Sequence, residues 1–221
     1  YTQYMGSARP KRKRKSTPDL ADVAVPRTRA EMRMETREQI RRAAFELFSS
    51  VGYDETTTSA IATRAGVAAG TVFVHATDKV DLLSLVMHDL LDEVVAERFS
   101  SLPDAPLVDR FVYVFHGVFA MYARHPKMAA AFVKNLPGAR GPNSDRVNTL
   151  TFGFFHRLGQ LVTEAQLKGE VAKDLNPILC AQNVFGLYFM TLMTWLSGHV
   201  PLEALEPLLR TSLELQYRGF R

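Results

Sequence analysis

The stretch that decides the fold is TTSAIATRAGVAAGTVFVH, residues 57–75, because it is punctuated like two short helices joined by one tight turn. Thr57 can cap the first helix, which has apolar residues at helical spacing, Ala60, Ile61 and Ala65. Gly66 can take the positive φ that ends such a helix, and a second helix is expected over residues 69–75. The stretch predicts a helix-turn-helix, whose second helix normally enters the DNA major groove.

An ordinary corner between two helices of a bundle would have the same spacing. The residues that follow favour DNA binding. DKVDLL, residues 78–83, opens a new helix with an acid near its start and a lysine that can point back towards the DNA side.

Residues 36–83 also contain an ordered set of short patterns: an amphipathic helix, G-[YF], T-T, I-A, A-G-V, G-T and K-x-D-L-L. The matching residues are Ile40, Ala44, Leu47, Phe48, Gly52, Tyr53, Thr56, Thr57, Ile61, Ala62, Ala65, Gly66, Val67, Gly70, Thr71, Phe73, His75, Lys79, Asp81, Leu82 and Leu83. In this set the chain resembles the TetR family of bacterial transcriptional regulators. It departs from the family pattern at Ala68, Ala69, Phe73, Val74 and Ala76.

The resemblance implies a repressor that a small ligand releases from a palindromic DNA operator. The expected DNA contacts lie in the helix pair and at the start of the next helix: Thr57, Thr58, Ser59, Ala69, Gly70, Thr71, Phe73, Val74, His75 and Lys79. Thr57 and the backbone at Gly70 and Thr71 would bind phosphates, and His75 and Lys79 match phosphate contacts of the family. Ala69 and Val74 can touch only apolar base edges, such as thymine methyl groups.

Charge is concentrated at the N-terminus of the chain. Residues 1–34 carry nine basic and three acidic side chains, whereas residues 35–83 carry five basic and seven acidic ones. Because phosphate attraction dominates DNA affinity, we expect residues 1–28 to form a disordered basic arm on DNA. A solvated tail or a localisation signal would have the same composition. The concentrated charges are Lys11, Arg12, Lys13, Arg14 and Lys15.

Length and composition suit one compact domain or a small domain fused to a larger one. The helical spacing of apolar residues, with no persistent strand pattern, predicts an all-α protein of about nine helices. The head is expected over residues 29–78 and a ligand-binding, dimerising body over residues 79–221. The helices are expected at 29–51, 57–65, 69–75, 79–99, 106–124, 126–136, 144–168, 177–197 and 201–217, with prolines in the first turn at Pro126, Pro177 and Pro201. The loop 137–143, PGARGPN, is expected to be mobile.

The body has many aromatic and methionine side chains with a few polar ones among them, the composition of a small-molecule pocket. Most of these side chains are expected in the hydrophobic core, whether or not the body binds a ligand. The expected partner is a small hydrophobic or aromatic ligand, with candidate contacts Phe115, His116, Phe119, Tyr122, Phe152, Phe155, His156, Gln160, Asn183, Tyr188 and Met193. A regulator without any small-molecule effector is the alternative, and a body without a sufficient cavity would favour it.

The last two helices are apolar on more than one face, so they are expected to pair with their mates in a homodimer. The six histidines and the single Cys180 show no metal-ligand spacing, and no catalytic motif occurs, so we expect no metal, no cofactor and no enzyme. The least favoured alternative is an all-helical enzyme whose catalytic pair is assembled from residues far apart in the sequence. The lone cysteine favours a reducing cytoplasm, and the apolar run 184–196 is too short to predict a membrane span.

Overall fold

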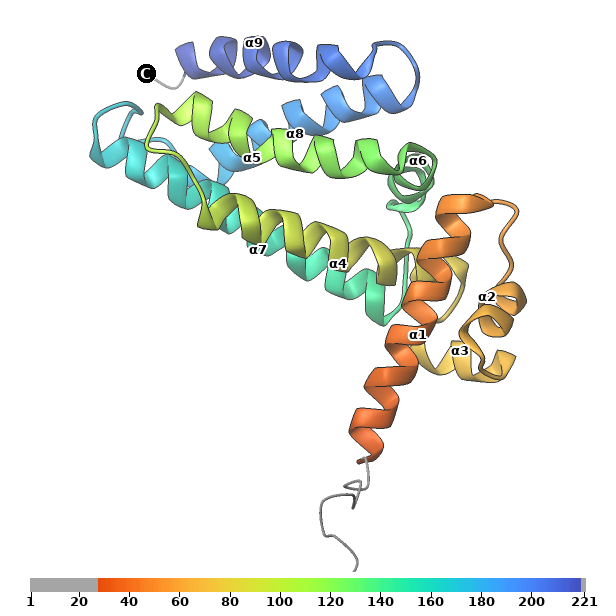
Figure 1. Ribbon diagram of the computed structural model, residues 1–221. Helices are drawn as coiled ribbons and strands as arrows, with labels where there is room; N and C mark the ends of the chain where they lie inside the picture. The colour runs from red at the N-terminus through yellow and green to blue at the C-terminus, as the bar shows by residue number, and fades with distance from the viewer. Residues whose placement is uncertain (1–27, 220–221) are drawn as a thin grey trace, which may run out of the picture.

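A computed structural model describes residues 28–219, and within that range the chain forms nine α-helices, one short 3-10 helix and no strand (Figure 1). This confirms the predicted all-α fold. The expected basic arm lies outside the described residues, apart from Thr28. The helices are α1 (Arg29–Ser50), α2 (Thr58–Ala65), α3 (Ala69–His75), α4 (Lys79–Ser100), α5 (Leu107–Arg124), α6 (Pro126–Asn135), α7 (Pro142–Leu167), α8 (Pro177–Leu196), the 3-10 helix η2 (Leu202–Ala204) and α9 (Leu205–Arg218).

Most helix ends follow the expected chemistry. Pro126 and Pro177 begin α6 and α8, where the missing N–H costs little. Pro201 differs, because it precedes η2 and the last α-helix begins at Leu205. Helix α7 begins two residues earlier than predicted, with Pro142 in its first turn and Gly141 at φ 118° before it.

The helix-turn-helix forms as the sequence predicts. The Thr57 hydroxyl accepts a hydrogen bond from the Ala60 amide at 3.1 Å and so caps α2. Gly66 ends α2 in the left-handed conformation at φ 70°, which glycine adopts without strain. Ile61 on α2 and Val72 on α3 are fully buried and hold the pair in the hydrophobic core of the head.

The body is a layered bundle in which α4 and α7 lie side by side and α5, α8 and α9 stack above them (Figure 1). Helix α8 packs between α7 and α9. Its 20 residues have a mean hydropathy of 1.3, enough by length and composition to cross a membrane. A core helix of a bundle has the same properties, and α8 buries Ala181, Val184 and Leu192 against its neighbours.

Helix α4 connects the two parts of the molecule. It starts beside α3 in the head and runs into the body, where it packs on α5 and α7 (Figure 1). Seven consecutive residues, 81–87, are buried, so this part of α4 is covered on all sides. The head therefore cannot change its angle to the body without moving α4 or its neighbours.

Candidate functional site

The exposed face of α3 is small and apolar. Ala69 and Gly70 are exposed at its start, Phe73 and Val74 are 54% and 62% exposed, and Val72 points into the core. Exposed Thr57 and Ser59 and half-buried Thr58 lie at the start of α2, and Thr71 is half-buried. The helix pair thus presents the surface expected of a major-groove reader, with shape and methyl groups in place of charge. The individual contacts remain predictions.

Two expected phosphate contacts are engaged inside the protein. The side chain of His75 is buried, and this burial, together with Arg33 and Arg37, lowers the pKa of its imidazole. The Lys79 ammonium donates to the carbonyl oxygens of Tyr53 and Asp54 at 2.9 and 3.1 Å. Lys79 therefore holds the start of α4 to the loop between α1 and α2. The phosphate contacts expected of His75 and Lys79 remain predictions.

All five basic side chains between residues 35 and 83 have protein partners. Arg41 and Arg42 bind Glu38, and the Arg41 guanidinium also lies 3.4 Å from Asp89 on α4. These arginines lower the pKa of Glu38 to about 2. The remaining pairs are Arg37 with Asn143, Arg64 with Glu46, and Lys79 with the two carbonyls named above. The head therefore keeps little cationic charge free for DNA.

A buried carboxyl group joins α4 to the start of α7. Asp81 is fully buried, and its two oxygens accept hydrogen bonds from the amides of Thr77, Asn143 and Ser144 at 2.9–3.1 Å. The Asn143 side-chain amide and the Ser144 hydroxyl complete the set at 3.1 and 3.2 Å. Two of these donors are first-turn amides of α7, so a side chain of α4 caps the N-terminus of α7.

The same cluster reaches α1 and α3. The Asn143 side chain donates to the carbonyl oxygen of His75 at 2.9 Å and accepts from Arg37 on α1 at 3.1 Å. A Cβ atom at Gly141 would lie 2.5 Å from the carboxyl carbon of Asp81, so only glycine fits there. We call Arg37, Asp81, Gly141, Asn143 and Ser144 the joint. The loop expected to be mobile therefore ends in a buried contact between head and body.

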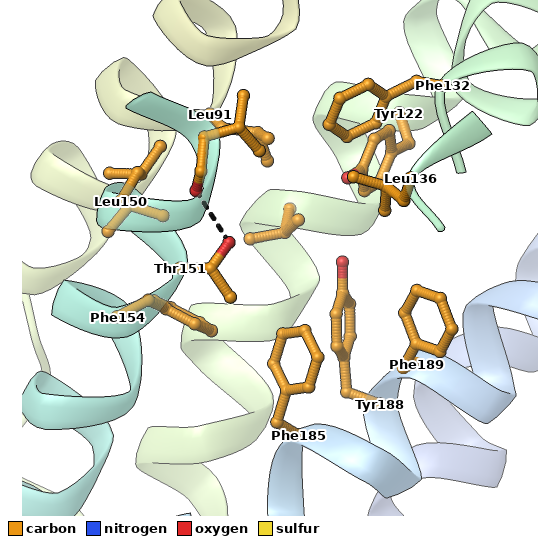
Figure 2. A pocket seen from close by; sticks show the side chains of 13 residues that line it. Leu91, Tyr122, Phe132, Leu136, Leu150, Thr151, Phe154, Phe185, Tyr188 and Phe189 are labelled. Atoms are coloured by element: carbon orange, nitrogen blue, oxygen red, sulfur yellow. Dashed lines mark hydrogen bonds between the residues drawn. The ribbon is translucent and has the colours of Figure 1, made fainter. Parts of the chain in front are cut away.

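A small apolar cavity lies inside the body between α4, α5, α6, α7 and α8 (Figure 2). Its volume is about 70 Å³, well below the roughly 300–1,000 Å³ of typical ligand sites. Two of its lining residues, Leu91 and Val95, belong to α4. The other lining residues are Val118, Tyr122, Phe132, Leu136, Val147, Leu150, Thr151, Phe154, Phe185, Tyr188 and Phe189.

Of the predicted ligand contacts, Tyr122 and Tyr188 line this cavity. Phe115 and Phe119 lie one layer behind, with ring centroids 4.5 and 5.3 Å from that of Tyr188, and Phe155 packs on Phe185. The rest do not line it, because they lie on other faces of their helices. Phe152 is 72% exposed, His116 binds Glu206, and the others are His156, Gln160, Asn183 and Met193.

Comparison with known proteins agrees with the head geometry. The model of the family described as bacterial regulatory proteins, tetR family, matches residues 40–86, from the core of α1 to the buried part of α4. This chain belongs to the TetR family. It is therefore a DNA-binding transcriptional regulator.

The similarity extends into the body of this TetR-family regulator. The fatty acid metabolism regulator protein of Bacillus subtilis is 25% identical over 158 residues, covering 71% of this chain and 81% of that protein. The structure of FadR from B. subtilis in complex with stearoyl-CoA has a TM-score of 0.65 at 24% identity, covering 79% of this chain and 95% of that one. Thermus thermophilus FadR, a repressor in complex with lauroyl-CoA, has a TM-score of 0.63 at 23% identity, covering 84% and 95%.

Residues 28–219 contain no group of three or more His, Cys, Asp or Glu side chains that could hold a metal ion. Cys180 is buried, and its burial raises the pKa of the thiol, which disfavours the reactive thiolate. The relatives named above are transcriptional regulators.

Proposed function

We propose that this regulator is a repressor that a long-chain acyl-CoA releases from its DNA operator. The observation that carries the proposal is that α4 serves both parts of the molecule. Its start is fixed to α1–α3 and to α7, and its middle supplies Leu91 and Val95 to the cavity wall. A ligand that widens the cavity must push on the helix that sets the angle of the head.

The cavity suits a hydrocarbon chain in chemistry, though not in its present size. Its lining is aliphatic and aromatic except for three hydroxyls, those of Tyr122, Thr151 and Tyr188. At about 70 Å³ it holds only part of an acyl chain, so binding requires α4, α6, α7 or α8 to move apart. A coupling free energy of about 1–3 kcal/mol between ligand and DNA would account for release. The stearoyl-CoA and lauroyl-CoA complexes of the two FadR proteins support this ligand class.

The test is operator release measured by fluorescence anisotropy. A duplex selected by the protein from a random DNA library is the probe, and stearoyl-CoA, lauroyl-CoA and CoA alone are the titrants. We expect release by the two acyl-CoAs and none by CoA alone. If no acyl-CoA lowers DNA affinity, the regulator works without this effector, and the effector-free alternative stands.

A cavity-filling variant links release to the cavity. In Leu91→Trp the indole should occupy the space, so the protein should stay on DNA at acyl-CoA concentrations that release the parent protein. Leu167→Trp is the matched control, because Leu167 is 81% exposed at the end of α7. Release of both variants at the same acyl-CoA concentration would place the ligand elsewhere.

The operator should be a palindrome read by a homodimer through α8 and α9. Leu179, Asn183, Gly186 and Met190 recur at helical spacing on one exposed side of α8. Leu208 and Leu215 are 43% and 70% exposed on α9. These stripes would form a four-helix bundle with their mates and present two heads about 34–36 Å apart, one turn of DNA.

A charge placed in the α8 stripe tests the dimer. Met190→Asp should shift sedimentation towards the monomer and weaken operator binding, because one head alone reads only a half-site. Leu167→Asp, on an exposed residue outside both stripes, should stay dimeric. A dimeric Met190→Asp protein would exclude this interface.

The basic arm should supply the charge that the head lacks. The first turns of α1 project beyond α2 and α3, and residues 28–35 are all exposed (Figure 1). If three of the charges in Lys11–Lys15 contact phosphates in each protomer, the log-log salt slope of a dimer should steepen by roughly five, at about 0.9 per contact. Deleting residues 1–26 should weaken binding to operator and random DNA alike. Equal salt slopes would show that the arm is solvated.

The proposed division of the chain follows from these roles. Residues 29–78 read DNA, residues 79–221 dimerise and sense the ligand, and the joint connects them. A regulator of this kind acts where the chromosome lies, in the bacterial cytoplasm.

A further inference from the structure

Two phenol groups face each other inside the apolar cavity. Tyr122 comes from α5 and Tyr188 from α8, and both side chains are buried. Figure 2 shows their hydroxyls facing each other across the space between the helices. Burial raises the pKa of both phenols, so both keep their protons at neutral pH.

The hydrogen-bonding capacity of this pair is not used up. Two phenols carry two O–H protons, and a hydrogen bond between the two hydroxyls would use only one of them. The other lining side chain with a polar atom is Thr151, whose hydroxyl donates to the Val147 carbonyl at 2.9 Å. The remaining lining side chains are hydrocarbon. One phenol proton is therefore available to a ligand acceptor, and a buried donor without an acceptor is costly.

The position of Tyr188 is fixed by aromatic packing. The ring of Phe115 stacks on it at 4.5 Å with an interplanar angle of 16°, and the rings of Phe119 and Phe185 lie 5.3 and 5.4 Å away. Such packing holds the ring, so the hydroxyl position is set before a ligand arrives. Phe115 and Phe119 thus act behind the cavity surface and not on it.

We infer that the Tyr122–Tyr188 hydroxyl pair is the polar recognition site of the cavity and donates a hydrogen bond to the neutral carbonyl oxygen of an acyl thioester or ester. The inference rests on the proposed function. It narrows the ligand class, because no lysine, arginine or histidine lines the cavity. A free fatty acid would have to bury its carboxylate without a countercharge, which is far more costly than burying a carbonyl that accepts a hydrogen bond.

Three ligands with one chain length separate these possibilities by isothermal titration calorimetry on the full chain. Stearoyl-CoA carries the thioester carbonyl, S-octadecyl-CoA is the thioether without it, and stearate carries the carboxylate. One hydrogen bond is worth up to about tenfold in affinity. We expect stearoyl-CoA to bind about tenfold more tightly than the thioether, and stearate to bind most weakly.

Conservative substitutions assign the preference to the pair. The Tyr122→Phe/Tyr188→Phe double variant, which removes both hydroxyls, should reduce the preference for thioester over thioether to about onefold while leaving thioether affinity unchanged. Tyr113→Phe is the matched control on α5, because its hydroxyl binds Ser101 at 2.9 Å away from the cavity. It should keep the full preference. Melting temperatures of the variants check that each is folded.

The outcomes separate this inference from the proposed function. If the thioester and thioether bind equally tightly and both release DNA, the inference that the cavity recognises a thioester or ester carbonyl is wrong. The repressor mechanism then stands. Tighter binding of stearate than of the thioester, or an undiminished preference in the Tyr122→Phe/Tyr188→Phe double variant, also overturns the inference. If none of the three binds or releases DNA, the proposed function itself fails.

Discussion

The joint and the tyrosine pair are both buried polar clusters, but they differ in how completely they are satisfied. At the joint, the carboxyl group of Asp81 accepts from four N–H groups and one hydroxyl. In the cavity, the neutral hydroxyls of Tyr122 and Tyr188 face each other, and at least one of their two O–H protons has no acceptor among the lining side chains. A saturated cluster fixes a structure, whereas an unsaturated one in a cavity is available to a ligand. The comparison suggests that the joint transmits and the tyrosine pair senses.

The largest expected effect comes from breaking the joint at its centre. Asp81→Ala removes the acceptor of four N–H groups, three of them in buried hydrogen bonds, and it should lower the free energy of unfolding by about 3–5 kcal/mol. Urea denaturation measures the change. Asp145→Ala is the control, because Asp145 is an exposed acid in the same first turn of α7 and should cost under about 1 kcal/mol. Equal losses for the two variants would mean that the joint is not a saturated structural cluster.

Two glycines in one loop test how closely the joint is packed. Gly141 and Gly138 both have positive φ, at 118° and 90°, but an added Cβ meets the Asp81 side chain only at Gly141. Each alanine substitution carries backbone strain of about 1–3 kcal/mol. Gly141→Ala should lose about 1–2 kcal/mol more than Gly138→Ala because of overpacking. Equal unfolding free energies would show that the loop can move away from Asp81.

Alkaline pH tests the tyrosine pair. The pKa of a phenol in the unfolded chain is about 10, and burial raises the pKa of Tyr122 and Tyr188 above that value. Above pH 10 the unfolded state therefore binds fewer protons than the native state, so stability falls as pH rises. The loss should be about 1.4 kcal/mol per pH unit for each phenol still protonated. The Tyr122→Phe/Tyr188→Phe double variant should lack this fall, and parallel stability curves between pH 9 and 11 would contradict it.

The smallest expected effect lies at the edge of the joint. Arg37→Ala removes the hydrogen bond to the Asn143 side chain and should cost about 1 kcal/mol of stability. Arg42→Ala breaks a pair on a side chain that is 71% exposed, and it should cost less than about 0.5 kcal/mol. Thermal denaturation measures both losses. If Arg42→Ala lost more stability than Arg37→Ala, Arg37 and with it α1 would not belong to the joint.

The head could be predicted from sequence nearly residue by residue, and the joint could not. Capping at Thr57 and the left-handed turn at Gly66 are local, so residues within a few positions decide them. The contact between Asp81 and Asn143 joins residues 62 apart, and no local pattern specifies it. The glycine- and proline-rich loop indicated a break in the helices, but it gave no sign that the residues after the break are buried.

The cavity could be predicted from the sequence only in part. Aromatic and polar composition pointed to helices that line the cavity and to two of its lining residues, Tyr122 and Tyr188. It could not set which face of α7 turns inward, so exposed Phe152 and His156 were chosen while Thr151 and Phe154 line the space. One residue along a helix turns a side chain by about 100°, and only packing against α4 and α8 fixes that rotation. His116 was misplaced for the same reason.

The small volume of the cavity has a kinetic consequence. An acyl chain cannot enter a space of about 70 Å³ until the helices separate, so opening precedes binding. In stopped-flow mixing with excess acyl-CoA, the observed rate should rise with concentration and then level off at the opening rate, in place of the linear rise of a preformed site. At that plateau the time needed to leave DNA would be set by the protein's own fluctuations, however much ligand is supplied.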